Sequence, residues 1–163
     1  MFQTTKADCE EIMKADKWCA NLRKSSDRTV EVYTIECETS HPDFSEAKVI
    51  LRKAPGRRVT INLFVETDEG REPIKRLDYD PSHPNIPKYD RIGVSPTLHQ
   101  VVAPNREGES LLNPEFLNPD DLSPWTLLQG FLKEIRVDCP GKKLQEWYPD
   151  LYKNLFEASD GDQ

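Results

Sequence analysis

The segment AKVILRKAPGRRVTINLFVE, residues 47–66, decides the fold of this chain. Apolar and polar residues alternate in both of its halves, and the turn signal Pro55-Gly56 separates them. Alternation with a period of two is typical of half-buried strands, and a short turn joins antiparallel neighbours. We therefore expect a β-hairpin of residues 47–53 and 57–66. On the first strand we expect one side to carry Val49 and Leu51, and the other side to carry Lys48, Ile50 and Arg52.

Further strand patterns flank this hairpin on both sides. Residues 29–38 alternate in the same way before it, and the turn signal Asp68-Glu69-Gly70 leads to another strand at 72–78. Residues 98–103 have the composition of a further short strand. Consecutive strands with short turns predict an antiparallel β-meander of about five strands.

Three helices are expected around this meander. Residues 5–24 carry apolar side chains at near-helical spacing, and 122–135 form the clearest amphipathic segment, after N-cap residues at 118–121. Pro140-Gly141 is expected to end that helix, and a last helix spans 144–156. An N-terminal helix, then strands, then two helices predict an α+β fold in which the helices pack on one face of the sheet.

The 163 residues suit a single domain, with a core at about 5–156 and a frayed tail at 157–163. The net charge is −7, yet residues 46–106 hold 11 basic and 8 acidic side chains. A net-acidic chain is not a general nucleic-acid binder, because non-specific affinity comes from neutralising phosphates. The basic segment could still guide one RNA strand, and the alternative is a solvated sheet surface of mixed charge.

No apolar run opens the chain, and nowhere do 18 apolar residues follow one another. We therefore expect no signal peptide, no membrane span and a cytoplasmic location. The cysteines show neither a CxxC pair nor zinc-ligand spacing, so we expect them to be reduced, buried apolar residues. They are Cys9, Cys19, Cys37 and Cys139.

The loop from Arg76 to His99 carries the residues best suited to chemistry. It contains two of the three histidines of the chain, His83 and His99. Histidines 16 positions apart converge only if the loop folds back, and its prolines would restrict the backbone enough for that. An arginine near them could hold a phosphate through its planar fork of donors. The loop residues considered for a site are Arg76, Asp78, His83, Arg91 and His99.

This loop resembles a signature shared by TumE-type toxins and related small bacterial proteins. The resemblance rests on Arg76-x-Asp78, His83-Pro84-Asn85, Ile92-Gly93 and Pro96-Thr97-Leu98-His99. Those families carry an R-x-D element at a strand end and a P-H-x-H element opening the next strand. Thr97 stands where they usually place an additional histidine, which puts the activity of this chain in doubt.

The resemblance implies a toxin component of a bacterial toxin–antitoxin or phage-defence system. We expect RNA as a possible substrate and a cognate antitoxin or another protein as a possible partner. The chemistry that we infer is RNA cleavage without a metal or cofactor. His83 and His99 would share the acid and base roles, while arginine stabilises the phosphate and Asp78 orients a histidine. The substrate-binding residues expected beside Arg76 are Arg91, Lys75 and Tyr79.

Other interpretations stand beside this one. Arg76 and Asp78 share a strand face by period two, so a local ion pair would also explain them. His41 has no partner motif and suits a structural role. A metal site of His83, His99 and Asp78 is less favoured, because no short ligand spacing supports it.

The main alternative function is a non-enzymatic protein–protein interaction module, such as an inhibitor, an adaptor or an accessory subunit of a defence complex. Edge strands and exposed aromatic residues would suit it. The aromatic residues expected at the surface are Trp147, Tyr148 and Tyr152.

Overall fold

The computed structural model describes residues 6–68, 70–80, 97–102, 110–112 and 123–152. Its elements in chain order are α1 (Lys6–Lys14), β1 (Lys17–Asp27), β2 (Val30–Thr39), β3 (Glu46–Ala54), the 3-10 turn η1 (Pro55–Arg57), β4 (Arg58–Thr67), β5 (Gly70–Asp80), β6 (Thr97–Val102), β7 (Ser110–Leu112), α2 (Pro124–Glu134), β8 (Val137–Asp138) and α3 (Gly141–Trp147).

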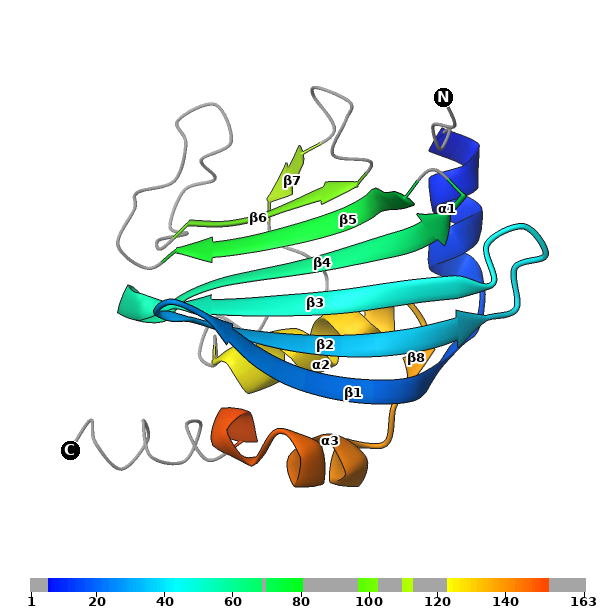
Figure 1. Ribbon diagram of the computed structural model, residues 1–163. Coiled ribbons are helices and arrows are strands. Elements are labelled where there is room, and N and C mark those ends of the chain that lie inside the picture. The colour runs from blue at the N-terminus through cyan, green and yellow to red at the C-terminus, as the bar shows by residue number, and fades with distance from the viewer. Residues whose placement is uncertain (1–5, 69, 81–96, 103–109, 113–122, 153–163) are drawn as a thin grey trace.

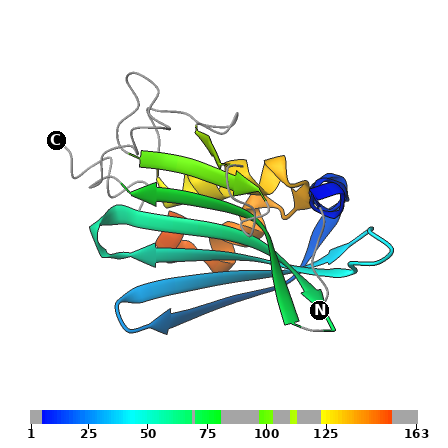
Figure 2. The same ribbon diagram turned by 90° about the horizontal axis from the view of Figure 1, so that it is seen from above.

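One curled sheet contains all the described strands, in the order β7-β6-β5-β4-β3-β2-β1-β8. Strands β1 to β7 follow one another as an antiparallel meander, and β8 joins the outer side of β1 in parallel. Helices α2 and α3 lie on one face of the sheet, and α1 stands at one end of it (Figures 1 and 2). The predicted α+β class is confirmed, with more strands than the five expected.

The helix-covered face of the sheet forms the core. In β4 every second side chain is buried, and the residues paired with Ile61 and Leu63 in β3 and β5 are buried as well. Helix α2 supplies the other half of the core with Trp125, Leu128 and Phe131. The alternation of residues 47–66 therefore predicts correctly which side of each strand meets the helices. The fully buried residues of β4 are Val59, Ile61, Leu63 and Val65.

The predicted helix at 5–24 is wrong in its second half. The helix ends at Lys14, and residues 17–27 form β1, which pairs along its length with β2. Leu22 and Cys19 do continue the helical spacing of the preceding residues. In a regular strand residues three apart point to opposite faces, but β1 contains a bulge between Cys19 and Asn21 that brings Leu22 to the buried face. The hydrogen bonds and packing offered by β2 decide the outcome.

The C-terminal part differs from the prediction in its boundaries. Helix α2 begins after Ser123, whose side chain accepts a hydrogen bond from the backbone N–H of Thr126 at 3.3 Å. The cap predicted at 118–121 lies outside the described residues. Pro140-Gly141 was expected to end a helix, but it begins α3, because a proline is tolerated at the first positions of a helix. Strands β7 and β8 are too short to show a pattern in the sequence.

A buried lysine ties these parts together. The Lys17 side chain is 1% exposed, and its ammonium donates to the carbonyl oxygens of Met13 at 3.3 Å, Ala15 at 2.8 Å and Ile135 at 2.6 Å. Carbonyls at a helix C-terminus lack intrahelical partners, so a cation is favourable there. We call this group of contacts the Lys17 clamp. It joins the ends of α1 and α2 to the start of β1.

Candidate functional site

The predicted site residues fall into two groups. His83 and Arg91 lie outside the described residues. Arg76, Asp78, Lys75 and Tyr79 belong to β5, and His99 belongs to β6, whose strand was expected at this place. The described part of the candidate site therefore lies on β5 and β6.

Arg76 and Asp78 form an ion pair on the face of the sheet away from the helices. The Arg76 Nε atom donates to the Asp78 carboxylate at 2.9 Å, and Thr60 Oγ1 on β4 donates to Asp78 Oδ1 at 3.2 Å. The pairing arises because residues two apart in a strand point to the same face. The local ion pair considered from the sequence is confirmed. We call this face, opposite to the helices, the open face.

His99 lies directly opposite Asp78 in the β5–β6 ladder. On the other side of β5, Asp78 is paired with Thr60. His99, Asp78 and Thr60 thus lie on successive strands, directly opposite one another across the sheet. We describe residues aligned in this way as lying at the same level of the sheet. This neighbourhood could not be derived from the sequence, because the length of the intervening loop does not fix the register of β6 on β5.

Lys75 points the opposite way. Its ammonium lies 2.6 Å from a carboxylate oxygen of Glu134 on α2 and 5.4 Å from the ring centroid of Phe131. The side chain is 1% exposed, and burial lowers its pKa, which the Glu134 carboxylate partly offsets. Tyr79 also packs against the core. Lys75 therefore joins sheet and helix, on the face opposite to Arg76 and Asp78.

Arg52 was not selected from the sequence. It lies in β3 directly opposite Thr60, so it stands at the same level of the sheet as Asp78 and His99. Its side chain is exposed, and it makes neither a hydrogen bond nor an ion pair within the described part of the chain. The alternation of Lys48, Ile50 and Arg52 is the signal that could have placed it on the open face.

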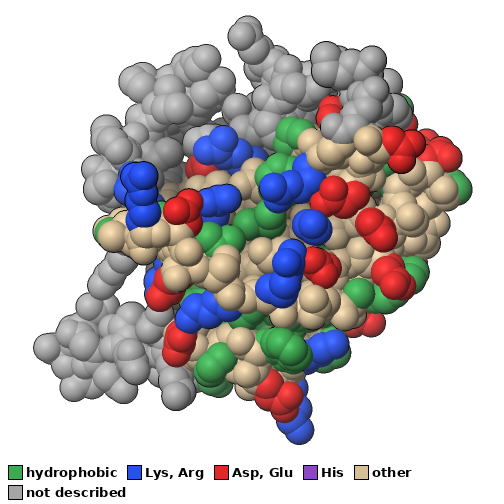
Figure 3. Space-filling view, viewed as in Figure 1, with side chains coloured by type: hydrophobic (Ala, Val, Ile, Leu, Met, Phe, Trp, Pro, Cys, Tyr) green, Lys and Arg blue, Asp and Glu red, His purple; other side chains and the backbone are tan. Residues whose placement is uncertain are grey.

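Two other cations of the open face are already paired with carboxylates. Arg23 lies 2.6 Å from Glu36, and Lys48 lies 3.1 Å from Glu66. Basic and acidic side chains are interspersed over this face, and acidic ones gather toward the end of the sheet at the right of the view (Figure 3). The face is thus of mixed charge, as the second interpretation of the sequence expected.

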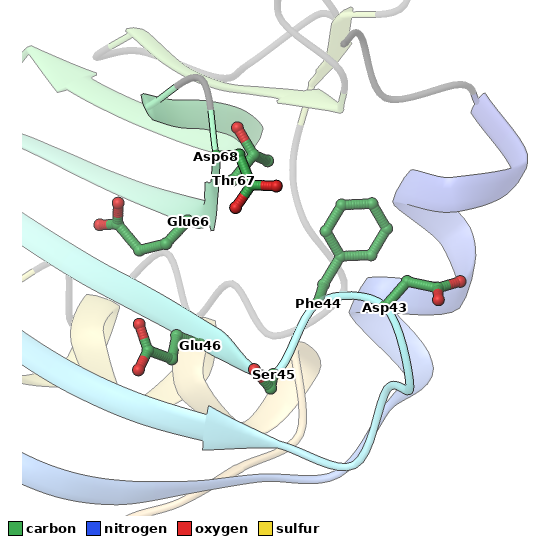
Figure 4. Close-up of a pocket in the computed structure, with 7 residues that line it drawn as sticks. All are labelled: Asp43, Phe44, Ser45, Glu46, Glu66, Thr67 and Asp68. Atoms are coloured by element: carbon green, nitrogen blue, oxygen red, sulfur yellow. The ribbon is translucent and has the colours of Figure 1, made fainter.

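A cavity of about 450 Å³ opens at that acidic end. The β2–β3 connection and the β4–β5 turn line it from two sides (Figure 4). Its lining would repel a phosphate, so it is no candidate for the RNA site expected from the sequence. The residues that line it are Asp43, Phe44, Ser45, Glu46, Glu66, Thr67 and Asp68.

His41 has a structural role beside this cavity. Its Nε2 atom lies 3.2 Å from a carboxylate oxygen of Glu11 on α1, and its Nδ1 atom accepts the backbone N–H of Asp43 at 3.1 Å. Its ring stacks at a tilt on Phe44 with centroids 5.0 Å apart. These contacts hold the β2–β3 connection against α1, in agreement with the structural role expected for this histidine.

The structure differs from two further expectations, which concern the cysteines and the exposed aromatic residues. Cys9 and Cys37 are buried as expected, but Cys19 and Cys139 are only half-buried; all four are free thiols. Among the aromatic residues expected at the surface, Trp147 is 51% exposed, whereas Tyr148 is fully buried. The Tyr148 hydroxyl lies 2.7 Å from the carbonyl oxygen of Thr34, which removes it from any surface contact.

The described residues contain no group of three His, Cys, Asp or Glu side chains placed to hold a metal ion. The less favoured metal site would need His83, which is outside them. Within the described ranges, no helix is long and apolar enough to cross a membrane.

Comparisons with protein-family models, with curated proteins and with solved structures find no match to this chain. The resemblance to TumE-type toxins therefore stays a prediction that rests on the motif residues alone.

Proposed function

We propose that the chain is a toxin-like, metal-independent ribonuclease whose site lies on the open face of β3 to β6. The observation that supports this most is the strand register, which puts His99 opposite Asp78. An imidazole beside a carboxylate is held in one tautomer and orientation, and its protonated form is stabilised. This pairing suits a histidine that takes up and releases a proton during each turnover.

The proposed reaction is attack of a ribose 2′-hydroxyl on the adjacent phosphorus atom. A base takes the 2′-hydroxyl proton, the P–O5′ bond breaks, and an acid protonates the leaving 5′-oxygen, which leaves a 2′,3′-cyclic phosphate. His99 takes one of these roles and His83 the other, and Asp78 positions His99. Acid–base catalysis of this kind contributes roughly 10²- to 10⁴-fold to a rate.

Arg52 is the residue that we assign to the phosphate. Arg76 already donates to Asp78 at 2.9 Å, whereas the exposed Arg52 side chain is unpaired within the described residues and stands at the level of Asp78. A guanidinium donates to two phosphate oxygens at once, and charge-assisted bonds of this type are strong. Arg76 then acts mainly by fixing Asp78.

A cleavage assay tests the proposal. Purified protein is incubated with total RNA, with and without EDTA, beside the variants His99→Ala, Arg52→Gln and Arg23→Gln. We expect cleavage that resists EDTA, its loss in His99→Ala, and at least a tenfold weaker RNA affinity in Arg52→Gln. Arg23→Gln is the matched control, because Arg23 is paired with Glu36 on the same face. Cleavage that His99→Ala leaves unchanged would refute the proposal.

Growth of a bacterial host provides the matching test in cells. Expression of the chain is expected to inhibit growth, and His99→Ala is expected to relieve the inhibition at equal protein level. A small adjacent gene whose product restores growth would identify the antitoxin. Unchanged toxicity of the variant would contradict the assigned role of His99.

A protein–protein interaction module is the second candidate, and one observation favours it. Trp18 on the open face is 42% exposed, and its Nε1 donates to Glu38 at 2.8 Å. Exposed tryptophans with one polar bond are enriched among the residues that dominate interfaces. If the chain binds the product of an adjacent gene without cleaving RNA, and Trp18→Ala abolishes that complex, this second function is the correct one.

A further inference from the structure

Three thiols meet at the β1 edge of the sheet, away from the proposed ribonuclease site. Cys19 lies directly opposite Cys37 in the β1–β2 ladder. On the other side of β1, the parallel register pairs Trp18 with Asp138, and each strand continues with a cysteine. Cys19 thus has a cysteine on both sides.

The geometry suits a covalent bond between Cys19 and Cys139. Neighbouring strands are about 4.8 Å apart, within the range of about 4.4–6.8 Å between Cα atoms that a disulfide requires. Both side chains pack against the core and are half-buried, and the Cys19 thiol is near enough to Cys139 to contribute to the raised pKa of Cys139. Cys37, by contrast, is only 3% exposed, so small oxidants reach it least.

We propose that Cys19 and Cys139 form a reversible dithiol–disulfide site that small peroxides oxidise. The Cys19 sulfur attacks one oxygen of hydrogen peroxide, the O–O bond breaks, and a sulfenic acid and water form. The Cys139 sulfur then attacks the Cys19 sulfur, the S–O bond breaks, and a second water leaves. Two thiols are oxidised to one disulfide while one peroxide is reduced to two waters.

The order of attack follows from the surroundings of Cys139. Burial, and then the neighbouring Cys19 thiol, raise the pKa of Cys139 to about 12. Cys139 therefore keeps its proton at neutral pH, and the thiolate is the reactive form. We assign the first attack to Cys19. When the Cys139 sulfur then attacks the sulfenic acid, its proton goes to the leaving hydroxyl group, which departs as water.

The proposed bond would connect two distant parts of the chain. Residues 19 and 139 enclose all of β2 to β7, and Cys139 follows β8, which comes directly after α2. A cross-link here would fasten the helix layer to the edge strand β1. Closing a ring of this size removes much conformational freedom from the unfolded chain, so oxidation should raise the melting temperature by roughly 10 °C.

Peptide mapping tests the proposal directly. The folded protein is treated with hydrogen peroxide, free thiols are blocked with iodoacetamide, and the tryptic digest is analysed by mass spectrometry. Cleavage after Lys and Arg puts each cysteine in a peptide of its own: 7–14, 18–23, 29–48 and 137–142. We expect a disulfide between peptides 18–23 and 137–142 that dithiothreitol removes. Absence of this product, or a bond from 18–23 to 29–48 in its place, would overturn the proposal.

Two variants complete the design. Cys139→Ser should remove the proposed disulfide partner of Cys19, leave only the buried Cys37 beside it, and abolish the rise in melting temperature on oxidation. Cys9→Ala is the matched control, because Cys9 lies buried in α1 outside the cluster, and it should keep both the cross-link and the rise. Circular dichroism of the reduced variants verifies that they fold. A rise that persists in Cys139→Ser would refute the assignment.

Discussion

Two adjacent cations on β5 show that the two faces of this sheet contribute differently to stability. Lys75 pairs with Glu134 at 2.6 Å and is 1% exposed, whereas Arg76 pairs with Asp78 at 2.9 Å and is 47% exposed. Both are close ion pairs, but only the first is shielded from water. A charge that is buried without its partner is costly, while exposed pairs contribute little. Stability therefore depends on the helix-covered face, and the open face is free to serve a ligand.

Replacing Phe131 by alanine should give the largest effect. Phe131 is fully buried in α2 and lies beneath the Lys75 ammonium. Its loss should lower the free energy of unfolding by about 3–5 kcal/mol, which urea denaturation measures. Phe64→Ala is the control on the open face, where the half-buried ring lies 5.4 Å from the Arg71 guanidinium carbon. Equal losses of unfolding free energy in the two variants would contradict the difference between the two faces.

Lys17→Met should cost somewhat less, about 2–4 kcal/mol. The methionine fills the space of the lysine stem, but the three carbonyl oxygens of the Lys17 clamp lose their donor. Buried acceptors without a donor cost about 1–3 kcal/mol each, part of which local water can recover. Lys24→Met is a suitable control, because Lys24 pairs with Asp150 at the surface, and its effect should stay below about 1 kcal/mol.

The same variant should change how stability depends on pH. Burial lowers the pKa of Lys17 from 10.5 to about 8, so above pH 8 the unfolded chain binds more protons than the folded one. Stability should then rise with pH, by at most about 1.4 kcal/mol per unit. Burial raises the pKa of Cys37 from 9.0 to about 12, which opposes this rise above pH 9. We expect a rise between pH 8 and 9 in the wild type.

That rise should be smaller in Lys17→Met, because the lowered pKa of Lys75 acts in the same direction and remains. Urea denaturation at pH 7, 8, 8.5 and 9 in a reducing buffer measures it. Identical slopes in the two proteins would show that Lys17 does not titrate in this range.

The Lys75–Glu134 pair should show an intermediate effect. Glu134→Gln leaves the buried Lys75 ammonium without its counter-charge and should cost about 1–2 kcal/mol, since water reaches the 31% exposed Glu134 side chain. Lys75→Met removes the buried charge altogether and should be neutral within about 1 kcal/mol. If both variants lose the same amount of free energy, the unpaired Lys75 ammonium costs no more than the loss of the whole pair, which would contradict this prediction.

Asp78→Asn should give the smallest change in stability, below about 1 kcal/mol in urea denaturation. Under the proposed function, however, the same change removes the carboxylate of the residue paired with His99 in the β5–β6 ladder and should slow RNA cleavage at least tenfold. The conservative Asp78→Glu should recover part of the rate. A loss of stability above 2 kcal/mol would mean that the open face is as structural as the covered one.

The sequence predicts the fold best where a residue pattern is compatible with only one kind of secondary structure. The alternation in residues 47–66 is confirmed in β3 and β4, and the helical spacing around Phe131 is confirmed in α2. In β1 the apolar spacing fits a helix better than a regular strand, and only pairing with β2, across the bulge after Cys19, makes this segment a strand. Local patterns fail to predict the secondary structure where pairing with another segment of the chain determines it.

The arrangement of the candidate site was harder to predict from the sequence, because it also depends on the pairing of distant segments. Period two places Arg76 beside Asp78 and predicts their ion pair. It does not say that His99 lies opposite Asp78, or that Arg52 stands two strands away at the same level, because both depend on register. The direction of Lys75 could have been derived, since it lies on the other side of the strand from its neighbour Arg76.

The Lys17 clamp has a consequence for how the molecule opens. Helix α1 has only nine residues, a length at which an isolated helix is marginal in water. Its end nevertheless shares one ammonium with the end of α2, 118 residues along the chain. Fraying of α1 from its C-terminal end therefore has to loosen the α2 carbonyl and the start of β1 as well. Amide hydrogens in this turn should exchange with solvent mainly when the whole domain unfolds, as those of the central strands do.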